Sequence, residues 1–222
     1  MLCQFTVKNF KSIRDEATFD MQAAAISEHE NRIIIDKDEE KYLPVSAIYG
    51  PNGGGKSNVL AALHTLVAKV LRPLFATEDS EEKVLLQKKL IVEPFAFSQS
   101  KDGSTEFELF FRTTVSEYRY ILHVKRDIVL YESLDRVKLE TGRKSALFTR
   151  DENGIILKGA FAKLKVSNEL SKTLTLLSYL GIAYKGNAVV KDVLSWFEYG
   201  IEFLNYGNPI QELRMAVSTS EE

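Results

Sequence analysis

A glycine-rich stretch that ends in lysine and serine is the part of this sequence best suited to chemistry. Residues 47–63 read AIYGPNGGGKSNVLAAL, and Gly50, Gly55, Lys56 and Ser57 fit the pattern G-x-x-x-x-G-K-[ST] without a mismatch. This pattern is typical of loops that bind the phosphates of a nucleoside triphosphate. The sequence therefore predicts nucleotide binding at this loop.

Each residue type in this loop has a physical reason to be there. Side chains at Gly53, Gly54 and Gly55 would obstruct backbone N–H groups that converge on a phosphate chain, and would disfavour the dihedral angles this needs. Lys56 can bring a positive charge to the β- and γ-phosphates, and the Ser57 hydroxyl suits Mg²⁺, which takes few protein ligands and keeps most of its waters. A helix that begins here would add its partial positive N-terminus.

The elements on either side of the loop must position these residues. Before it, the apolar run LPVSAIY at residues 43–49 predicts a strand. After it, apolar residues recur at steps of three and four, which predicts a helix over residues 57–75 with one buried face. The residues on that face are Leu60, Leu63, Val67, Val70, Leu71 and Leu74.

The first 42 residues and the middle of the chain favour β structure. Alternation in residues 2–7 predicts a strand, and ATFDM at residues 17–21 predicts its antiparallel hairpin partner. Residues 27–42 are polar around three isoleucines and predict a surface loop or short strand. Residues 91–158 are rich in β-branched and aromatic residues separated by turns, and Asn153-Gly154 is a hairpin signal, so we expect an antiparallel meander there.

The remaining segments favour helices. The charged run at residues 78–90 predicts a short helix on the surface. The pattern becomes helical again from Phe161, and Gly181 is well placed as a C-cap. Helical spacing then continues from Val190 to Leu204, with Trp196 and Phe197 inside it.

Composition excludes several classes of protein. The chain has 222 residues, 45% of them hydrophobic, which is enough for a sizeable core. Its 29 Lys and Arg nearly balance 31 Asp and Glu, so composition gives no support for a polybasic surface. Cys3 is the one cysteine, and no run approaches the roughly 20 apolar residues of a membrane span. We therefore expect a cytoplasmic protein without a membrane partner.

Several motifs together resemble a known group of ATPases. FTVKNFKSI near the N-terminus, followed by the glycine-rich stretch, resembles the N-terminal part of ABC-type ATPases of the RecF, structural-maintenance-of-chromosomes and overcoming-lysogenisation-defect kind. In particular, the chain resembles bacterial AAA-family ATP-binding proteins, many of them associated with phage defence and abortive infection. Three details favour this group over a GTPase or kinase: NFKS at residues 9–12, Pro51-Asn52 inside the loop, and Asn58 directly after Ser57. EPFAF, EYRYIL and YESL resemble its antiparallel lobe.

The resemblance implies a fold and a domain organisation. The expected fold is α/β, a P-loop NTPase of ABC type with an antiparallel β lobe and C-terminal helices. Residues 1–222 would be the N-terminal portion of one such domain. Within it, residues 1–76 would hold the nucleotide-binding strands, loop and helix, residues 91–158 the antiparallel lobe, and residues 160–206 a helical segment.

The resemblance also implies roles for individual residues. Residues 52–57 would hold the triphosphate of ATP, and Asn58 follows them directly in the sequence. Lys11 and Ser12, at the end of the first strand, would approach the phosphates or ribose. For Lys11, an ordinary place in a surface turn without a role in binding is the commoner explanation. Gln99 is a candidate for the glutamine that senses Mg²⁺ and the attacking water, and a polar residue in a hairpin loop is the plainer interpretation.

Hydrolysis in these ATPases needs further motifs that the sequence does not show. We find no Walker B acid pair, signature loop or switch histidine after the antiparallel region. IIIDKDEE at residues 33–40 precedes the phosphate loop, and Lys37 separates Asp36 from the next acids, so we interpret it as a charged surface loop. LIVEP ends in Glu93 alone. We therefore expect an incomplete ATPase domain that binds ATP and Mg²⁺ but hydrolyses ATP poorly, with Lys56 as its catalytic residue.

Three functional hypotheses follow. The first is an ABC-type ATPase in which two subunits sandwich ATP and drive an effector protein or an act on DNA. The second is a non-catalytic, nucleotide-dependent interaction module that recruits a partner through exposed edge strands or the Trp196-Phe197 helix. The third, a small P-loop kinase or GTPase, is weaker because the guanine-reading N-K-x-D motif is absent. The three histidines lack metal-ligand spacing, so we expect structural roles for them.

Overall fold

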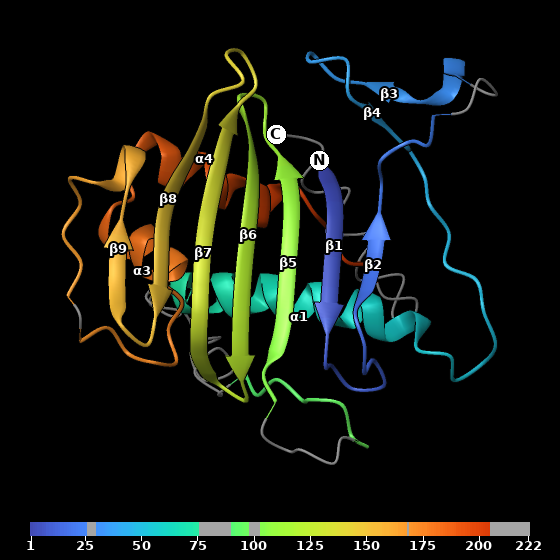
Figure 1. Cartoon of the computed structure of the whole chain (residues 1–222), viewed down its shortest axis with the longest axis horizontal. Helices are drawn as coiled ribbons and strands as arrows, with labels where there is room; N and C mark the ends of the chain where they lie inside the picture. The colour runs from blue at the N-terminus through green and yellow to red at the C-terminus, as the bar shows by residue number, and fades with distance from the viewer. Residues whose placement is uncertain (26–29, 76–89, 98–102, 168, 205–222) are drawn as a thin grey trace.

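The computed structural model describes residues 1–25, 30–75, 90–97, 103–167 and 169–204 (Figure 1). The predicted helix at residues 78–90 and the candidate Gln99 therefore lie almost entirely or entirely outside the described residues. The described elements, in chain order, are β1 (Leu2–Lys8), β2 (Ala17–Asp20), the 3-10 turn η1 (Glu30–Arg32), β3 (Ile34–Ile35), β4 (Lys41–Tyr42), α1 (Lys56–Phe75), β5 (Thr105–Arg112), β6 (Ser116–Lys125), β7 (Ile128–Lys138), β8 (Lys144–Asp151), β9 (Gly154–Leu157), the 3-10 turn η2 (Gly159–Phe161), α3 (Leu176–Ala183) and α4 (Ala188–Tyr199).

A seven-stranded sheet is the main layer of the molecule. Its strand order is β2-β1-β5-β6-β7-β8-β9, and all of its described neighbours pair antiparallel. This confirms the N-terminal hairpin and the antiparallel meander over residues 105–157, whereas residues 91–97 of the predicted range form no strand. β1 lies beside β5 although about 100 residues separate them, so the sheet joins the two regions that the sequence separates. The fold is thus mixed α/β with a large antiparallel sheet.

Helices α1, α3 and α4 cover one face of this sheet, and α1 crosses beneath the strands (Figure 1). The core forms where alternate strand residues meet these helices, because period-2 strands send every second side chain to the same face. Side chains that are at most 3% exposed include Phe5, Val7, Phe107, Leu109, Phe111, Tyr120, Leu122, Leu63, Leu66, Val70, Leu180, Val193 and Phe197. Cys3 is also buried in β1, as a small apolar residue would be.

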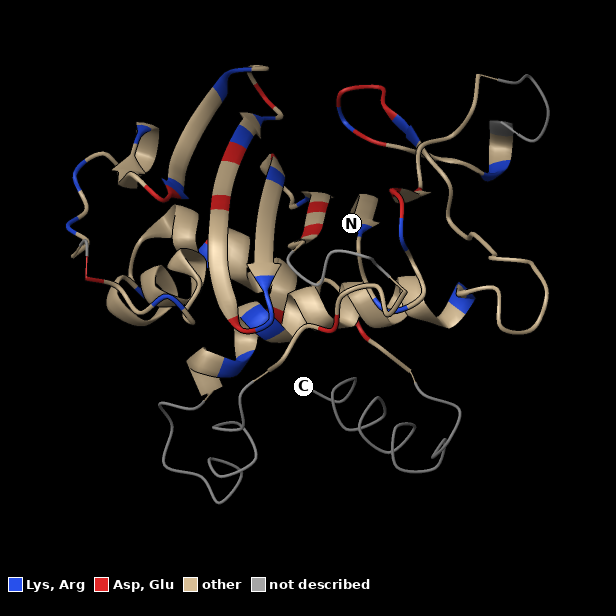
Figure 2. Cartoon of the chain, turned by 60° about the horizontal axis from the view of Figure 1, so that its bottom comes forward, with Lys and Arg blue, Asp and Glu red and all other residues tan. Residues whose placement is uncertain are grey.

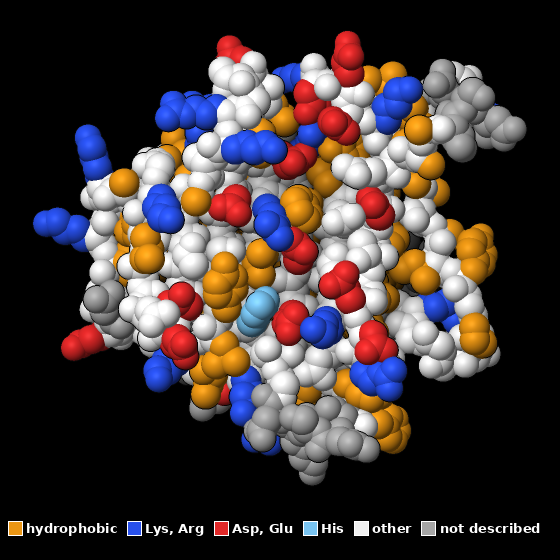
Figure 3. Space-filling view, viewed as in Figure 1, with side chains coloured by type: hydrophobic (Ala, Val, Ile, Leu, Met, Phe, Trp, Pro, Cys, Tyr) orange, Lys and Arg blue, Asp and Glu red, His pale blue; other side chains and the backbone are white. Residues whose placement is uncertain are grey.

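The opposite face of the sheet carries no described helix. Charged and apolar side chains are interspersed over it (Figure 3), without a large area of one sign. Lys and Arg are likewise mixed with Asp and Glu along the described ribbon (Figure 2). This distribution agrees with the near-balance of charges in the sequence.

The prediction of a strand before the phosphate loop is wrong. Residues 43–50 have no regular secondary structure, and Val45 and Tyr49 are 78% and 89% exposed. Leu43 donates one backbone hydrogen bond to Met21 O, and the segment then leaves the sheet. An apolar run becomes a strand when a neighbouring strand supplies ladder partners, and no described strand lies alongside this one.

The helical segment predicted for residues 160–206 is shorter and broken. Residues 162–167 and 169–175 contain turns in place of the first half of the predicted helix, and α4 ends at Tyr199, with Gly200 as its C-cap. Gly181 is not a C-cap, because α3 continues to Ala183. A Cβ atom at Gly181 would lie 2.5 Å from Leu194 Cδ1 and 2.7 Å from Leu74 Cδ2. Gly181 therefore lets three helices approach closely.

α1 has the predicted helix boundaries to within one residue, and most of its predicted apolar face is confirmed, because Leu71 and Leu74 also pack against the core. The buried residues include Ala62, Leu63, Leu66, Val67 and Val70, whereas Leu60 is 51% exposed. By length and composition, α1 is also the one described helix that would suffice to cross a bilayer. Apolar core helices meet the same criterion, and the inner face of α1 packs on the sheet.

Trp196 and Phe197 belong to the core rather than to a recruitment surface. They are 3% and 1% exposed, and the Trp196 ring lies 4.5 Å from that of Phe111, centroid to centroid. The suggestion that this helix segment presents these rings to a partner is therefore wrong.

Candidate functional site

The glycine-rich loop and the start of α1 are joined as the motif predicts. Residues 52–55 form turns and bends, and the helix begins at Lys56. Residues 50–54 are exposed and Gly55 and Lys56 are half-buried, so the loop is open to solvent from one side. No acidic residue lies in the first turn of α1, so its N-terminal partial charge is not neutralised by its own sequence.

Two of the three consecutive glycines adopt a backbone that other residues disfavour. Gly53 has φ +79° and Gly55 has φ +85°, both in the left-handed region. A Cβ atom at Gly55 would also lie 3.0 Å from Ser12 Oγ. The glycine requirement inferred from the motif thus has a geometric basis at these positions.

The Lys56 ammonium group lies against the loop that precedes it. Its Nζ donates hydrogen bonds of 2.7 Å to Gly50 O and 2.7 Å to Pro51 O. Two neutral carbonyls thus hold a cation at the mouth of the loop, in a partly exposed position. A phosphate oxygen would be a stronger, charged acceptor for the same group.

Several backbone donors of the loop are unused among the described residues. Gly54 N donates to Pro51 O and Asn58 N donates to Gly55 O, but the N–H groups of Gly53 and Gly55 have no described acceptor. The first N–H groups of an α-helix also lack intrahelical partners. Free donors, left-handed glycines and one ammonium group are the chemistry that a polyphosphate requires, so these residues fit a nucleotide.

Ser57 fits the expected role at a magnesium ion. It is exposed in the first turn of α1, and its hydroxyl makes no hydrogen bond to the described residues. A free hydroxyl next to the phosphate site can serve as a ligand for a cation that keeps most of its water. The described residues contain no group of three His, Cys, Asp or Glu side chains that could hold a metal by themselves.

The turn after β1 meets the loop through Ser12. Asn58 Nδ2 donates a 2.7 Å hydrogen bond to Ser12 Oγ, so the structure brings together two residues that the resemblance singled out. Lys11 belongs to the same turn, with φ +48°, but its Nζ lies over the Phe10 ring, 5.5 Å from the centroid. In this structure Ser12 touches the α1 side of the site, and the Lys11 ammonium contacts an aromatic ring instead.

Sequence reasoning counted Asn9 in the motif of the resemblance but assigned it no role, and the structure shows that Asn9 fixes this turn. Asn9 has φ +55°, and its side chain accepts from Phe95 N at 3.0 Å and donates to Ser104 O at 2.9 Å. Its carbonyl accepts from Thr105 Oγ1. An asparagine between a strand and a lysine-serine pair was the available signal, because Asn tolerates the left-handed region better than most residues.

Asp36 and Asp38, which precede the phosphate loop in the sequence, lie in a charged hairpin loop and have a structural role. Asp38 accepts two hydrogen bonds from Arg112, at 2.6 and 2.8 Å, and Asp36 accepts one at 3.0 Å. Arg112 also binds Glu117 and lies over the Tyr42 ring, so it fastens the β3–β4 hairpin to β5. The Arg112 hydrogen bonds lower the pKa of Asp38 below its usual value. Glu93 contributes its carbonyl to Lys11 N.

The described histidines also serve packing. His64 on α1 makes an edge contact with Phe203, 5.0 Å between centroids, and His123 on β6 lies beside Tyr131. Burial lowers the pKa of His123. His29 lies outside the described residues.

Comparison with known proteins adds one match. The model of the family described as "AAA domain, putative AbiEii toxin, Type IV TA system" matches residues 45–188, which begin before the phosphate loop and end at the start of α4. No curated protein matches the chain. The matched range contains the whole loop and most of the antiparallel sheet.

Proposed function

The chain belongs to this AAA-domain family of nucleotide-binding, ATPase-like proteins, and from that premise we propose that residues 50–58 bind ATP together with Mg²⁺. In this proposal the backbone of Gly50, Pro51, Asn52, Gly53, Gly54 and Gly55 surrounds the phosphates. Lys56 neutralises charge on the β- and γ-phosphates and Ser57 supplies one ligand to the cation. Asn58 and Ser12 support the loop from behind.

The position of Lys56 is the observation that carries this proposal. Its ammonium group is held at the mouth of an exposed loop by two carbonyl oxygens, with unused N–H donors around it. A lysine ammonium group has three donors, and the two carbonyls use two of them, so one donor stays available to a ligand. An incoming phosphate would replace these neutral acceptors by charged ones.

Titration calorimetry with Mg-ATP tests the proposal. Lys56→Ala should weaken ATP binding roughly a hundredfold or more, because it removes charge-assisted hydrogen bonds worth about 3 kcal/mol. The matched control is Lys144→Ala, which removes an exposed lysine from β8. Unchanged affinity in the Lys56 variant, with the control also unchanged, would remove the central claim.

For chemistry beyond binding, we propose slow hydrolysis by the chain itself. Lys56 and Mg²⁺ would offset charge that develops in phosphoryl transfer to water, but the sequence shows no acid pair suited to orient that water. Purified protein should therefore release phosphate from ATP at a rate close to that of the Lys56→Ala variant. Robust turnover that Lys56→Ala abolishes would mean that a catalytic acid has been overlooked.

We also propose that the domain is of ABC type, and that two copies close on ATP to drive a cytoplasmic effector in defence or an act on DNA. The sequence resemblance and the open, solvent-facing loop support this arrangement. Size-exclusion chromatography with and without Mg-ATP should show a shift from monomer to dimer, and Lys56→Ala should abolish the shift.

A second candidate is a non-catalytic module that recruits a partner in a nucleotide-dependent way. The helix-free face of the seven-stranded sheet favours it, because this face is accessible on the described residues (Figure 3). A complex that forms equally well without ATP would favour recruitment over the ATP sandwich.

A further inference from the structure

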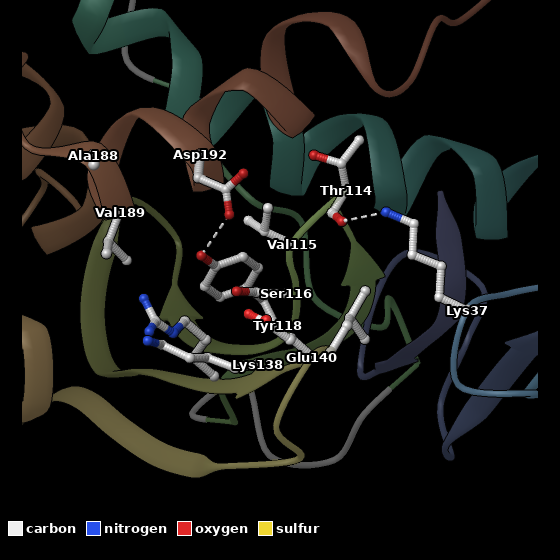
Figure 4. A pocket seen from close by; sticks show the side chains of 12 residues that line it. Lys37, Thr114, Val115, Ser116, Tyr118, Lys138, Glu140, Ala188, Val189 and Asp192 are labelled. Atoms are coloured by element: carbon white, nitrogen blue, oxygen red, sulfur yellow. Dashed lines mark hydrogen bonds between the residues drawn. The ribbon is translucent and has the colours of Figure 1, made fainter.

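A pocket lies at the other end of the sheet from the phosphate loop. It has a volume of about 640 Å³ and is formed by the β5–β6 turn, the start of β6, the end of β7 with the two residues after it, and the first half of α4 (Figure 4). The phosphate loop contacts the turn after β1, next to the start of β5. Because β5 is 8 residues long, roughly 25 Å separates these two ends of the strands. The pocket is thus a distinct site.

Three cationic side chains line this pocket, and their partners are few. Arg136 and Lys138 on β7 make no side-chain hydrogen bond or ion pair among the described residues, and Arg136 Nε is buried without an acceptor. Lys37 reaches the pocket from the β3–β4 hairpin and donates a long hydrogen bond of 3.4 Å to Thr114 O. Buried guanidinium groups normally have acceptors, because an unmet one costs free energy. Arg136 is half-buried and lines the pocket, so an anion there would supply an acceptor to the accessible part of its guanidinium group.

Two acidic side chains limit how much negative charge the pocket would accept. Asp192 Oδ2 accepts hydrogen bonds from Tyr118 Oη at 2.7 Å and Thr113 Oγ1 at 3.0 Å, and Glu140 lies at the rim (Figure 4). Three cations against two carboxylates leave one net positive charge. A singly charged ligand would balance this set, whereas a polyphosphate would be repelled by the acids.

The rest of the lining is apolar. Val115, Leu139, Ala188 and Val189 form the walls beside the charged groups. The N-terminus of α4 is not itself the anion site, because Asn187 already accepts from the N–H groups of Val189 and Val190. The walls therefore suit a ligand that has an apolar body as well as a charged end.

We propose that this pocket binds a small organic carboxylate, with its carboxylate on Arg136 and Lys138 and its apolar body against Val115, Leu139 and Val189. The planar guanidinium of arginine matches the two oxygens of a carboxylate. Lys37 closes the pocket from the hairpin that Arg112 fastens to β5. The site does not depend on nucleotide binding at the phosphate loop.

Benzoate is a suitable probe, since it combines one carboxylate with an apolar ring, and benzyl alcohol is its uncharged counterpart. In amide-resolved NMR of the full chain, benzoate should shift the signals of Val115, Lys138 and Val189, and benzyl alcohol should leave them in place. Arg136→Gln should weaken benzoate at least about tenfold, the scale of one charge-assisted hydrogen bond. Arg119→Gln is the matched control, because Arg119 is on the neighbouring strand and bonds to Glu108 on the open face.

Lys138→Gln is a second variant in case Arg136→Gln does not fold, because the Lys138 side chain is exposed and its replacement should leave the fold intact. Lys138→Gln should also weaken the binding of benzoate. The proposal is overturned if benzoate leaves these three amides unshifted, or if neither variant weakens it. Equal shifts with benzyl alcohol would show an apolar slot without anion recognition and would overturn it too. Phenyl phosphate, tested in the Lys56→Ala background, should bind more weakly than benzoate, and tighter binding would contradict the choice of a singly charged carboxylate.

Discussion

The Asn58 side-chain amide donates a 2.7 Å hydrogen bond to the Ser12 hydroxyl, and this contact joins the first turn of α1 to the turn after β1. The two residues are 46 positions apart, so the sheet and the phosphate loop are connected at the point where a nucleotide would bind. Movement of the turn after β1 would therefore displace the phosphate loop as well. The contact therefore gives a way to test whether the sheet supports nucleotide binding.

Ser12→Ala and Asn58→Ala should each weaken ATP binding modestly, and the double variant should lose less than the sum of the two. A shared hydrogen bond is worth about 1 kcal/mol, and a double-mutant cycle isolates it. Calorimetric affinities of the four proteins measure this coupling. Strictly additive losses would show that the contact does not contribute to binding.

Gly55→Ala should lower ATP affinity by about tenfold, because alanine at φ +85° is strained and its Cβ would lie 3.0 Å from Ser12 Oγ. Gly142→Ala is the control for strain alone. Gly142 has φ +63° in the β7–β8 turn, where an added Cβ would meet no atom within 4 Å. Both variants should lose some thermal stability, and the drop in affinity should be confined to Gly55→Ala.

The sequence was informative where structure is decided locally. Glycines, a lysine and helical spacing within a few residues of each other place the loop and the start of α1, and alternation places β5 to β9. Residues 43–49 were misjudged because a strand needs a partner that the local sequence does not encode. Gly181 was misjudged for a related reason, since its role depends on Leu74 and Leu194 from other helices. The proposed carboxylate pocket joins four distant segments, around Lys37 and at residues 114–118, 136–140 and 188–192, and has no sequence signature.

Gly181→Ala should destabilise the fold by about 1–3 kcal/mol, because its Cβ would overlap Leu194 and Leu74 and the helices would have to move apart. Gly186→Ala is a matched control in the turn between α3 and α4, where an added Cβ meets nothing within 4 Å. Urea unfolding of both variants measures the difference. Equal stability would mean that the three helices adjust at no cost.

Asp38→Asn should reduce stability by about 1 kcal/mol at pH 7 and by much less below about pH 3. The pKa of Asp38 is lowered by Arg112, so the folded state holds the charged carboxylate more tightly than the unfolded chain does. This contribution is present above the ordinary aspartate pKa and is lost as the pH falls through the lowered one. Asp15→Asn, at an exposed pair with Arg14, should change stability little at either pH. A constant difference between wild type and Asp38→Asn across the pH range would contradict this assignment.

Glu132 is the buried acid that holds α3 on the sheet. It is fully buried on β7, and its carboxylate accepts from Leu176 N at 2.6 Å, Leu177 N at 2.9 Å and Tyr120 Oη at 2.9 Å. Burial raises the pKa of Glu132, despite the opposing effect of these donors. Its contribution to stability is therefore fully present below the ordinary glutamate pKa and decreases as the pH rises toward the raised value.

Glu132→Gln should destabilise the fold by about 1–3 kcal/mol, because the amide NH₂ would face one of the two backbone N–H groups and leave it unmet. The variant should also lose the pH dependence that the raised pKa gives the wild type, so the difference in stability should be largest at acidic pH. Unfolding by urea at several pH values measures both effects, with Glu140→Gln as an exposed control on the same side of the sheet. A Glu132→Gln protein as stable as wild type at acidic pH would mean that α3 is held by its apolar face, through Leu176, Leu177 and Leu180, without the carboxylate.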